Sequence, residues 1–138
     1  MLFLYIVSSL EGFMSIKVLI VEDDPDFAAS LELALDLIGF SAVIAGSAEE
    51  ALEIMSSGAE EIKMGFFDIK LPQEDGISCY EKIRSQRPDF TGVVMTGFRD
   101  EKILDRARAV GPVDILLKPF KMSHFMDLAK KYSTQAAQ

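Results

Sequence analysis

Residues 17–25 read KVLIVEDDP, in which four aliphatic side chains are followed by three acidic ones. An aliphatic run without a polar member is typical of a strand buried on both faces, and such strands belong to parallel sheets covered by helices. Pro25 is tolerated in the first turn of a helix, and Asp24 is a good cap for that helix. The stretch therefore predicts a buried strand followed at once by a helix.

The same alternation repeats along the chain. Strands are predicted at residues 17–21, 41–45, 62–67, 92–95 and 113–117, and helices at 25–38, after Ser47, and at 76–86, about 99–110 and 121–132. Strand–helix alternation with short connections implies a parallel sheet with helices on both faces. We therefore predict an α/β fold with a doubly wound, five-stranded parallel sheet and five helices.

The composition indicates one globular domain and excludes several classes of partner. The chain has 138 residues, 49% of them hydrophobic, and a formal net charge of −8. A negative charge without a basic cluster disfavours binding to nucleic acid, so no nucleic-acid partner is expected. The single cysteine, Cys79, excludes an intrachain disulfide and a cysteine metal site. A reducing, cytoplasmic location is the expectation.

The first residues need a separate interpretation. Residues 1–13 read MLFLYIVSSLEGF, and the apolar run at 2–7 is too short to cross a bilayer. It also lacks the basic segment and cleavage site of a signal peptide. We predict an N-terminal extension at residues 1–14, as an over-extended start or an added segment; an extension that packs on the domain or a partner is the alternative. The domain itself is predicted at 15–133, with a polar tail at 134–138, and no membrane association is expected.

Polar side chains follow four of the predicted strands. Glu22 and Asp23 follow the first, Asp68 the third, Thr96 the fourth and Lys118 the fifth. In open parallel sheets, ligands bind at the carboxyl ends of the strands. Carboxylates without imidazole or thiolate favour Mg²⁺ or Mn²⁺, and an added ammonium and hydroxyl suit a phosphoryl group. One carboxylate can then act as a nucleophile, because aspartyl phosphates are known intermediates.

Four motifs on successive strand ends carry a resemblance to a known family. They are VLIVEDDP at 18–25, FFDIKLPQEDG at 66–76, VVMTG at 93–97 and LLKPF at 116–120. In this order and spacing they resemble the signature of response-regulator receiver domains of two-component signalling. The resemblance covers about residues 16–132. It implies a flavodoxin-like sheet with the strand order 2-1-3-4-5.

The resemblance also implies a role for each site residue. Asp68 matches the phosphoacceptor, and Glu22 and Asp23 match the acidic pair that holds Mg²⁺ (or Mn²⁺), Asp23 directly and Glu22 through water. The backbone carbonyl of Lys70 matches the remaining protein ligand of the metal, so the predicted metal set is Glu22, Asp23, Asp68 and Lys70.

Two further positions match groups that hold the phosphoryl group. Thr96 matches the hydroxyl residue that bonds it, and Lys118 matches the lysine that pairs with it. Pro119 matches a cis-peptide site. Asp24 is interpreted as a helix cap rather than as a metal ligand.

The resemblance implies a signalling phosphoacceptor rather than a turnover enzyme. A histidine kinase or histidine phosphotransfer protein would donate the phosphoryl group to Asp68. Because the predicted elements end soon after the fifth helix, we expect a single-domain regulator that acts as an adaptor, a relay or a phosphate sink on an unknown target. Residues 99–110 and 113–132, the helix 4–strand 5–helix 5 face of the family, are the expected surface for a target or a homodimer.

One alternative to a phosphorylated receiver stays open, and another is disfavoured. A receiver-like interaction module that no longer switches is the alternative, favoured by Ile115, which stands where the family often has the tyrosine or phenylalanine that turns inward. We predict that Ile115 only packs. An aspartyl-phosphate hydrolase of another fold is disfavoured, because Lys70 stands where such enzymes carry a second acid. Phe98 is predicted to shield the acyl phosphate from water, Cys79 to be inert and His124 to lie on the surface.

Overall fold

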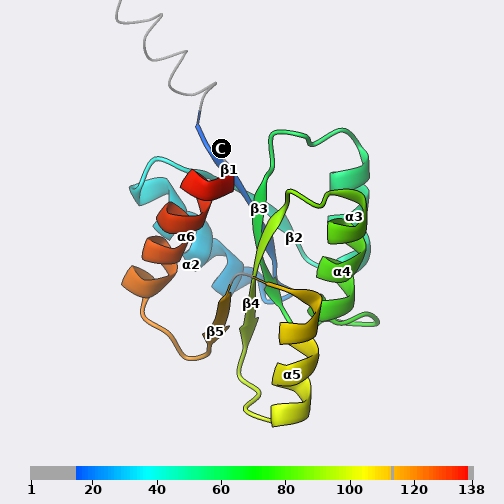
Figure 1. The fold of residues 1–138 in the computed structure, drawn as a ribbon. Coiled ribbons are helices and arrows are strands. Elements are labelled where there is room, and N and C mark those ends of the chain that lie inside the picture. Colours follow the sequence, from blue (N-terminus) through cyan, green and yellow to red (C-terminus); the bar gives the residue numbers. More distant parts are fainter. Residues whose placement is uncertain (1–14, 113, 137–138) are drawn as a thin grey trace, which may run out of the picture.

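Strands and helices alternate along the whole described chain, as predicted (Figure 1). The structure is a computed structural model, and it describes residues 15–112 and 114–136; the predictions for residues 1–14 lie outside this part. The strands are β1 (Lys17–Val21), β2 (Ser41–Ala45), β3 (Met64–Asp68), β4 (Thr91–Thr96) and β5 (Asp114–Leu117). The helices are α2 (Pro25–Leu37), α3 (Ala48–Ser56), α4 (Gly76–Gln86), α5 (Glu101–Val110) and α6 (Met122–Ala136).

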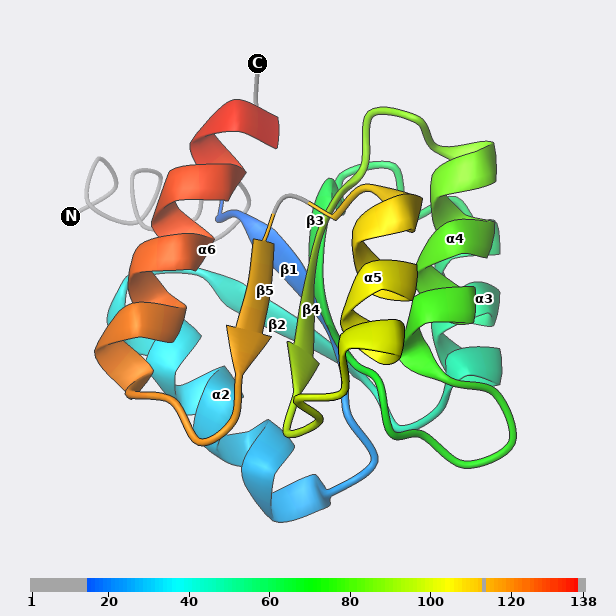
Figure 2. The same cartoon turned by 60° about the horizontal axis from the view of Figure 1, so that its bottom comes forward.

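The strands form one parallel sheet in the order β2-β1-β3-β4-β5. Helices α2 and α6 cover one face, and α3, α4 and α5 cover the other (Figure 2). The predicted fold class and the flavodoxin-like strand order are therefore confirmed. Because all five strands run the same way, their carboxyl ends meet at one edge of the sheet.

Phe66 and Phe67 face opposite sides of the sheet, because consecutive side chains of a strand alternate. The Phe66 ring packs on Phe125 of α6 with ring centroids 4.5 Å apart, and the Phe67 ring packs on Tyr80 of α4 at 5.3 Å. Both phenylalanines are fully buried. Burial of each contributes about 1.5–3 kcal/mol, so the end of β3 is anchored in both helical layers.

Several boundaries differ from the sequence predictions by one to four residues, and three of these differences have an identifiable cause. Strand β3 includes Asp68, which was expected just after the strand, because its backbone pairs in register with Met95 of β4. Helix α5 begins at Glu101 rather than near residue 99, since Asp100 caps it by accepting the Lys102 N–H at 2.8 Å. Helix α6 continues to Ala136, so residues 134–136 of the predicted polar tail are helical. No glycine or proline stops it there.

Within residues 15–112 and 114–136, none of the helices combines the length and the apolar character needed to cross a membrane.

Asp75 joins the start of α4 to α5. Its Oδ1 accepts the Ser78 N–H at 2.8 Å, which caps α4, and Arg106 of α5 donates to both carboxylate oxygens at 2.8 and 3.2 Å. Partial burial works to raise the pKa of Asp75, but the hydrogen bonds from Arg106 and Ser78 outweigh it and hold the pKa below its ordinary value. The charged form is therefore favoured by the folded state.

We expect Asp75→Asn to keep the cap and lose only the ion pair with Arg106. The loss in free energy of unfolding at neutral pH should be at most about 1 kcal/mol, since the pair is partly exposed to solvent. Because the folded-state pKa is lowered, this contribution is present above the ordinary value and is lost as the pH falls through the folded value. Urea unfolding of both proteins at neutral and acid pH measures it. Asp75→Ala, which also removes the cap, should cost about 1 kcal/mol more; equal losses for the two variants at neutral pH would contradict this division.

Candidate functional site

The carboxyl ends of four strands bring Glu22, Asp68, Thr96 and Lys118 together, as the sequence predicts. Figure 2 shows this edge at the arrowheads of β4 and β5. The Lys118 Nζ lies 2.9 Å from Glu22 Oε1 and 3.2 Å from Asp68 Oδ2. The Lys118 N–H donates to the Thr96 carbonyl at 2.8 Å, which places the ends of β4 and β5 side by side. One ammonium group therefore bridges two carboxylates from separate strands.

Both carboxylates are buried and fully hydrogen-bonded. Glu22 is 2% exposed and Asp68 is 6% exposed. The second oxygen of Glu22 accepts the Asp24 N–H at 3.2 Å, and the second oxygen of Asp68 accepts the Lys70 N–H at 3.2 Å. Every buried side-chain polar atom in the described part of the chain has a partner. These bonds and the ammonium offset the cost of burying two negative charges at one edge.

Burial and the neighbouring charges shift the pKa of two members of this cluster. Burial raises the pKa of Glu22, and the hydrogen bond from Lys118 opposes the shift without cancelling it. Burial works to lower the pKa of Lys118, but its hydrogen bond to Glu22 and the charge of Asp68 outweigh it and raise the pKa above the ordinary value. Lys118 is therefore a firmly protonated cation at neutral pH.

A hollow of about 280 Å³ opens beside Asp68. It is lined by Asp68, Lys70, Gly97, Phe98 and Lys118. The Phe98 side chain is 41% exposed, so its ring stands at the mouth of the hollow rather than in the core. The buried Thr96 is not among the lining residues, and its Oγ1 accepts the Phe98 N–H at 2.8 Å. A small anionic group on Asp68 would have room in this hollow, beside the Lys118 ammonium.

Glu22, Asp23 and Asp68 together offer the kind of oxygen ligands that a hard divalent cation prefers. Each offers a carboxylate oxygen, and these oxygens all lie within 4.8 Å of one another. A donor set of oxygens alone fits Mg²⁺ or Mn²⁺. The backbone of Lys70 passes beside Asp68 through the hydrogen bond from its N–H. The predicted coordination by the Lys70 carbonyl stays a prediction, as do the individual roles of the other site residues.

Two neighbours of the site were not singled out by the sequence. The Phe27 ring lies 4.6 Å from Lys118 Nζ, measured to the ring centroid. Gly76 lies so close to Asp68 that a Cβ at this position would overlap the Asp68 carbonyl oxygen. Phe27 is spaced like any core residue of its helix, and Gly76 stands in the sequence as the end of a motif and the start of a predicted helix. Both contacts depend on how the helices pack against the sheet.

Several smaller predictions are confirmed around the site. Asp24 caps α2 by accepting the Asp26 and Phe27 N–H groups at 3.0 and 3.2 Å, and the Lys118–Pro119 peptide is cis. Cys79 is fully buried, and burial raises the pKa of its thiol to about 12, which agrees with the expectation of an inert side chain. His124 is exposed. Ile115 is half-buried and packs against a core cluster formed by Ile69, Ile77, Val94 and Ala107.

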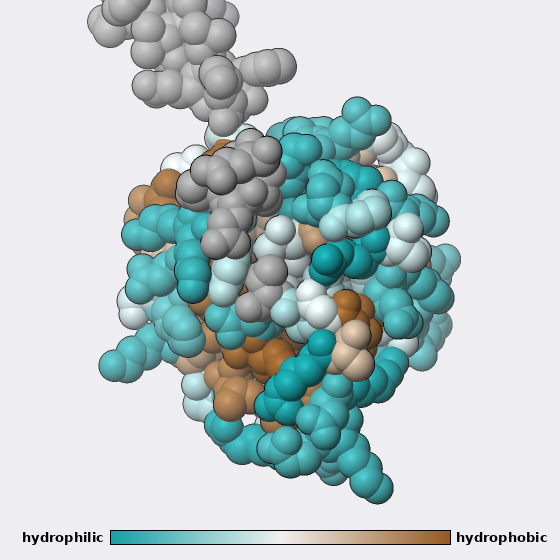
Figure 3. All heavy atoms as spheres, in the orientation of Figure 1, coloured by the Kyte–Doolittle hydropathy of each residue, from teal (hydrophilic) through white to brown (hydrophobic). Residues whose placement is uncertain are grey.

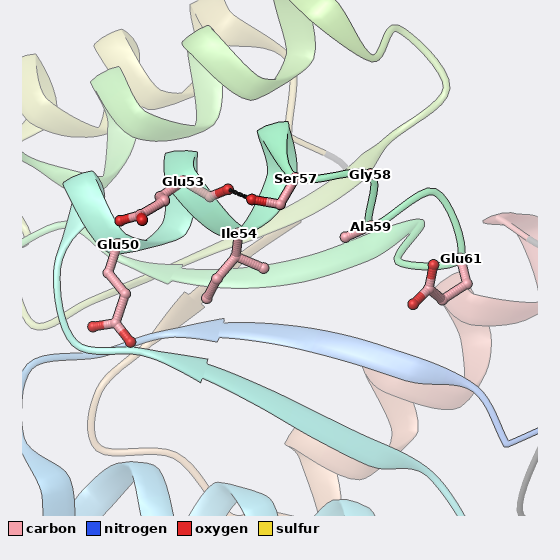
Figure 4. Close-up of a pocket in the computed structure, with 7 residues that line it drawn as sticks. All are labelled: Glu50, Glu53, Ile54, Ser57, Gly58, Ala59 and Glu61. Carbon is pink, nitrogen blue, oxygen red and sulfur yellow. Dashed lines mark hydrogen bonds between the residues drawn. The ribbon is translucent and has the colours of Figure 1, made fainter.

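A larger hollow of about 530 Å³ lies along α3 and shares no residue with the one at Asp68 (Figure 4). Glu50, Glu53 and Glu61 are among its seven lining residues, and none of the seven is basic. The dashed line in Figure 4 is the bond from Ser57 Oγ to the Glu53 carbonyl, 2.7 Å long. Three carboxylates line this hollow, and the cation that pairs with one of them, Lys17 with its Nζ 3.3 Å from Glu61, is a residue outside the lining. A phosphoryl group would be repelled by these carboxylates, so this hollow is not the candidate site.

A comparison with protein families decides the assignment. The family described as the response regulator receiver domain matches residues 18–130. The chain belongs to the receiver domain family. Receiver domains take phosphoryl groups from histidine kinases or phosphotransfer proteins and bind Mg²⁺ at an acidic pocket, and the acidic cluster of this receiver domain is Glu22, Asp23 and Asp68.

Two curated relatives of the receiver domain are transcriptional regulatory proteins. It is 30% identical over 115 residues to the C4-dicarboxylate transport transcriptional regulatory protein DctD of Rhizobium meliloti, a match that covers 83% of this chain and 25% of that protein. It is 33% identical over 108 residues to the transcriptional regulatory protein PdtaR of Mycobacterium tuberculosis, a match that covers 78% of this chain and 51% of that protein. The chain thus spans about a quarter to a half of the length of these relatives.

Solved structures resemble the receiver domain over most of their length. The response regulator receiver domain protein (CheY-like) from Methanospirillum hungatei JF-1 superposes with a TM-score of 0.83 at 25% identity, covering 89% of this chain and 97% of that one. A response regulator receiver protein from Pseudomonas putida superposes with a TM-score of 0.78 at 29% identity, covering 85% of this chain and 97% of that one. The receiver domain therefore shares the fold of these structures over the aligned 85–89% of the chain.

Proposed function

We propose that Asp68 is the phosphoacceptor of a two-component response regulator. One observation carries this proposal: the nearly buried Asp68 carboxylate lines a hollow of about 280 Å³ and lies 3.2 Å from the ammonium of Lys118. The donor is the phosphohistidine of a histidine kinase or of a histidine phosphotransfer protein. Membership of the receiver domain family supports this choice of donor.

The transfer forms one bond and breaks another. An Asp68 carboxylate oxygen attacks phosphorus in line, the new P–O bond forms, and the P–N bond of phosphohistidine breaks. The imidazole leaves with the electron pair of that bond and takes up a proton. Lys118 pairs with the phosphoryl oxygens, and the Thr96 hydroxyl, which accepts the Phe98 N–H, still has its own O–H to donate to them.

Glu22, Asp23, Asp68 and the Lys70 carbonyl would hold Mg²⁺ at this edge. When bound, the ion supplies charge stabilisation to the phosphoryl oxygens. Both oxygens of Glu22 already accept hydrogen bonds, from Lys118 and from the Asp24 N–H, whereas Asp23 is exposed. This difference supports a direct bond from Asp23 and a water-mediated one from Glu22.

Binding of beryllofluoride with Mg²⁺ tests the proposal, because this complex mimics a phosphoryl group on a carboxylate. The wild-type chain is expected to bind it and Asp68→Asn is not, as followed by titration of backbone amide NMR signals around the hollow. A wild-type chain that binds no better than Asp68→Asn would overturn the proposal. That result would support the non-switching interaction module, the reading that Ile115 favours.

The role of the whole regulator is a further part of the proposal. A single-domain adaptor, relay or phosphate sink is the role predicted from the sequence, and it stays a prediction beside curated relatives that are longer. The face formed by α5, β5 and α6 is the proposed surface for a target or a homodimer. Apolar side chains gather over β5 and the connection that follows it (Figure 3). Sedimentation with and without beryllofluoride checks the dimer.

Phe98→Ala is expected to shorten the lifetime of the phosphorylated protein. The ring stands at the mouth of the hollow that Asp68 lines, so its removal admits water to the acyl phosphate. The rate of dephosphorylation, followed by acid-quenched gel analysis after removal of the donor, should rise about ten-fold, as for an effect of about 1.4 kcal/mol on the barrier. Phe98→Leu, which keeps an apolar side chain there, should dephosphorylate at a rate between those of the wild type and Phe98→Ala. An unchanged rate for Phe98→Ala would exclude the shielding role.

A further inference from the structure

The Phe27 ring is the one aromatic group, in the described part of the chain, that faces the Lys118 ammonium. Phe27 lies in the first turn of α2, on a different element from Glu22, Asp68 and Lys118. Its ring centroid is 4.6 Å from Lys118 Nζ. The face of an aromatic ring carries negative charge density, and a cation within about 6 Å of its centroid is attracted to it. The contact between the ring and the ammonium is therefore attractive.

The Phe27 ring attracts the ammonium in a way that differs from the two carboxylates. An ammonium group has three N–H donors and no acceptor. Two carboxylates accept from it, Glu22 at 2.9 Å and Asp68 at 3.2 Å. The ring adds an attraction that neither titrates nor competes for the carboxylate oxygens. It therefore holds the ammonium at this edge without occupying the oxygens that a phosphoryl group or a metal ion would use.

The ring itself is fixed by further rings. Phe120 meets it edge-on, with centroids 5.8 Å apart and planes at 63°. Phe120 stacks on Phe125 at 6.3 Å, and Phe125 packs on the buried Phe66 of β3 at 4.5 Å. A continuous series of aromatic contacts thus runs from the core beneath Asp68 to the face that meets Lys118. A flexible lysine side chain is held by a rigid support.

We propose that Phe27 is a positioning residue that acts through Lys118: it holds the ammonium in place at Glu22 and Asp68, ready to receive phosphoryl oxygens. This inference rests on the proposed function of Asp68 and deepens it. Phe27 touches no reacting atom, so its contribution is made only by way of Lys118.

The first test needs no phosphorylation. A ring face close to the end of the lysine side chain shifts the signals of the Lys118 ε-methylene group upfield in carbon–proton correlation NMR. Phe27→Leu is expected to remove this shift, and Phe27→Tyr, which keeps the ring, to retain it. Phe40→Leu is the matched control, because Phe40, like Phe27, is half-buried and packs against the core between the sheet and helices α2 and α6. An unshifted Lys118 signal in the wild type, or one that Phe27→Leu leaves unchanged, would overturn the proposal.

The second test measures the reaction with acetyl phosphate, a small acyl phosphate that needs no protein docking surface. The P–O bond to acetate breaks as the bond to Asp68 forms, and acetate leaves. Phe27→Leu should slow phosphorylation about three- to ten-fold, in line with the strength of a cation–π contact. Phe27→Tyr and Phe40→Leu should stay near the wild-type rate.

A double-mutant cycle separates positioning from packing. In a Lys118→Met background, Phe27→Leu should cause no further loss, because the group on which it acts is absent. An equal loss in both backgrounds would mean that Phe27 acts by packing alone and would overturn the proposal. The proposal would also be overturned if Phe27→Leu slowed phosphorylation by a protein donor but not by acetyl phosphate. If the NMR shift behaves as expected but no chain is phosphorylated, the positioning contact stands and the proposed function of Asp68 fails.

Discussion

Replacing Lys118 by methionine is expected to lower the rate of phosphorylation of Asp68 about 100- to 1,000-fold, the effect of removing one preorganised group that stabilises charge in a transition state. Lys118 is the cation that bridges Glu22 and Asp68, and its pKa is raised, so its charge is present throughout the neutral range. Without it, the incoming phosphoryl group meets two buried carboxylates. The rate with acetyl phosphate and Mg²⁺ measures the loss.

The same substitution should change how stability depends on pH. Removing one partner of a buried ion pair costs up to about 3–5 kcal/mol. Burial already raises the pKa of Glu22, and the loss of Lys118 should raise it further. A raised folded-state pKa means that the contribution of Glu22 to the stability of the variant is most favourable in acid and is lost as the pH rises through that value. Urea unfolding across this range checks the sign.

Two comparisons make the Lys118 prediction specific. Lys121→Met, at an exposed position three residues on, changes the net charge equally and should leave the phosphorylation rate near that of the wild type. Added Mg²⁺ should stabilise Lys118→Met more than the wild type, because the ion then replaces the missing positive charge. A variant phosphorylated at more than a tenth of the wild-type rate would contradict the role of Lys118.

Gly76→Ala is expected to damage both the fold and the site. A Cβ at Gly76 would overlap the carbonyl oxygen of Asp68, which is backbone, so no side-chain rotation can relieve the clash. The start of α4 or the end of β3 must move instead. Such overpacking lowers the free energy of unfolding by about 1–3 kcal/mol, occasionally more. The shift also displaces Asp68, so phosphorylation should be slowed, as measured by urea unfolding and by acetyl phosphate kinetics on the same samples.

Gly46→Ala is the matched control for Gly76→Ala. A Cβ at Gly46 would lie 3.7 Å from Glu50 Oε2, an ordinary van der Waals distance. Its effect on stability should stay within about 0.5 kcal/mol. A Gly76→Ala variant as stable as Gly46→Ala would show that the backbones of β3 and α4 can separate without cost, contrary to the close approach seen here.

The sequence predicts the fold and the main members of the site for identifiable reasons. Aliphatic runs such as residues 18–21 are typical of a strand buried on both faces, and parallel strands bring their last residues to one edge. Glu22, Asp68 and Lys118 meet there, as this logic requires. The contacts of Phe27 and Gly76 could not be predicted in this way, because they depend on the tilt of a helix and on a close approach of two backbones. Neither a phenylalanine at position 27 nor a glycine at position 76 forms part of a sequence pattern that would indicate its contact.

The alternation of Phe66 and Phe67 has a consequence for how the state of Asp68 can be detected. One ring is seated among α2 and α6 residues, and the other against α4. A small displacement at the end of β3 would thus shift side chains in both helical layers, the one with α2 and α6 and the one with α4. Two binding proteins, one on each side, could then report the same event without sharing a contact. Such a two-sided output would not require the inward-turning ring that Ile115 replaces.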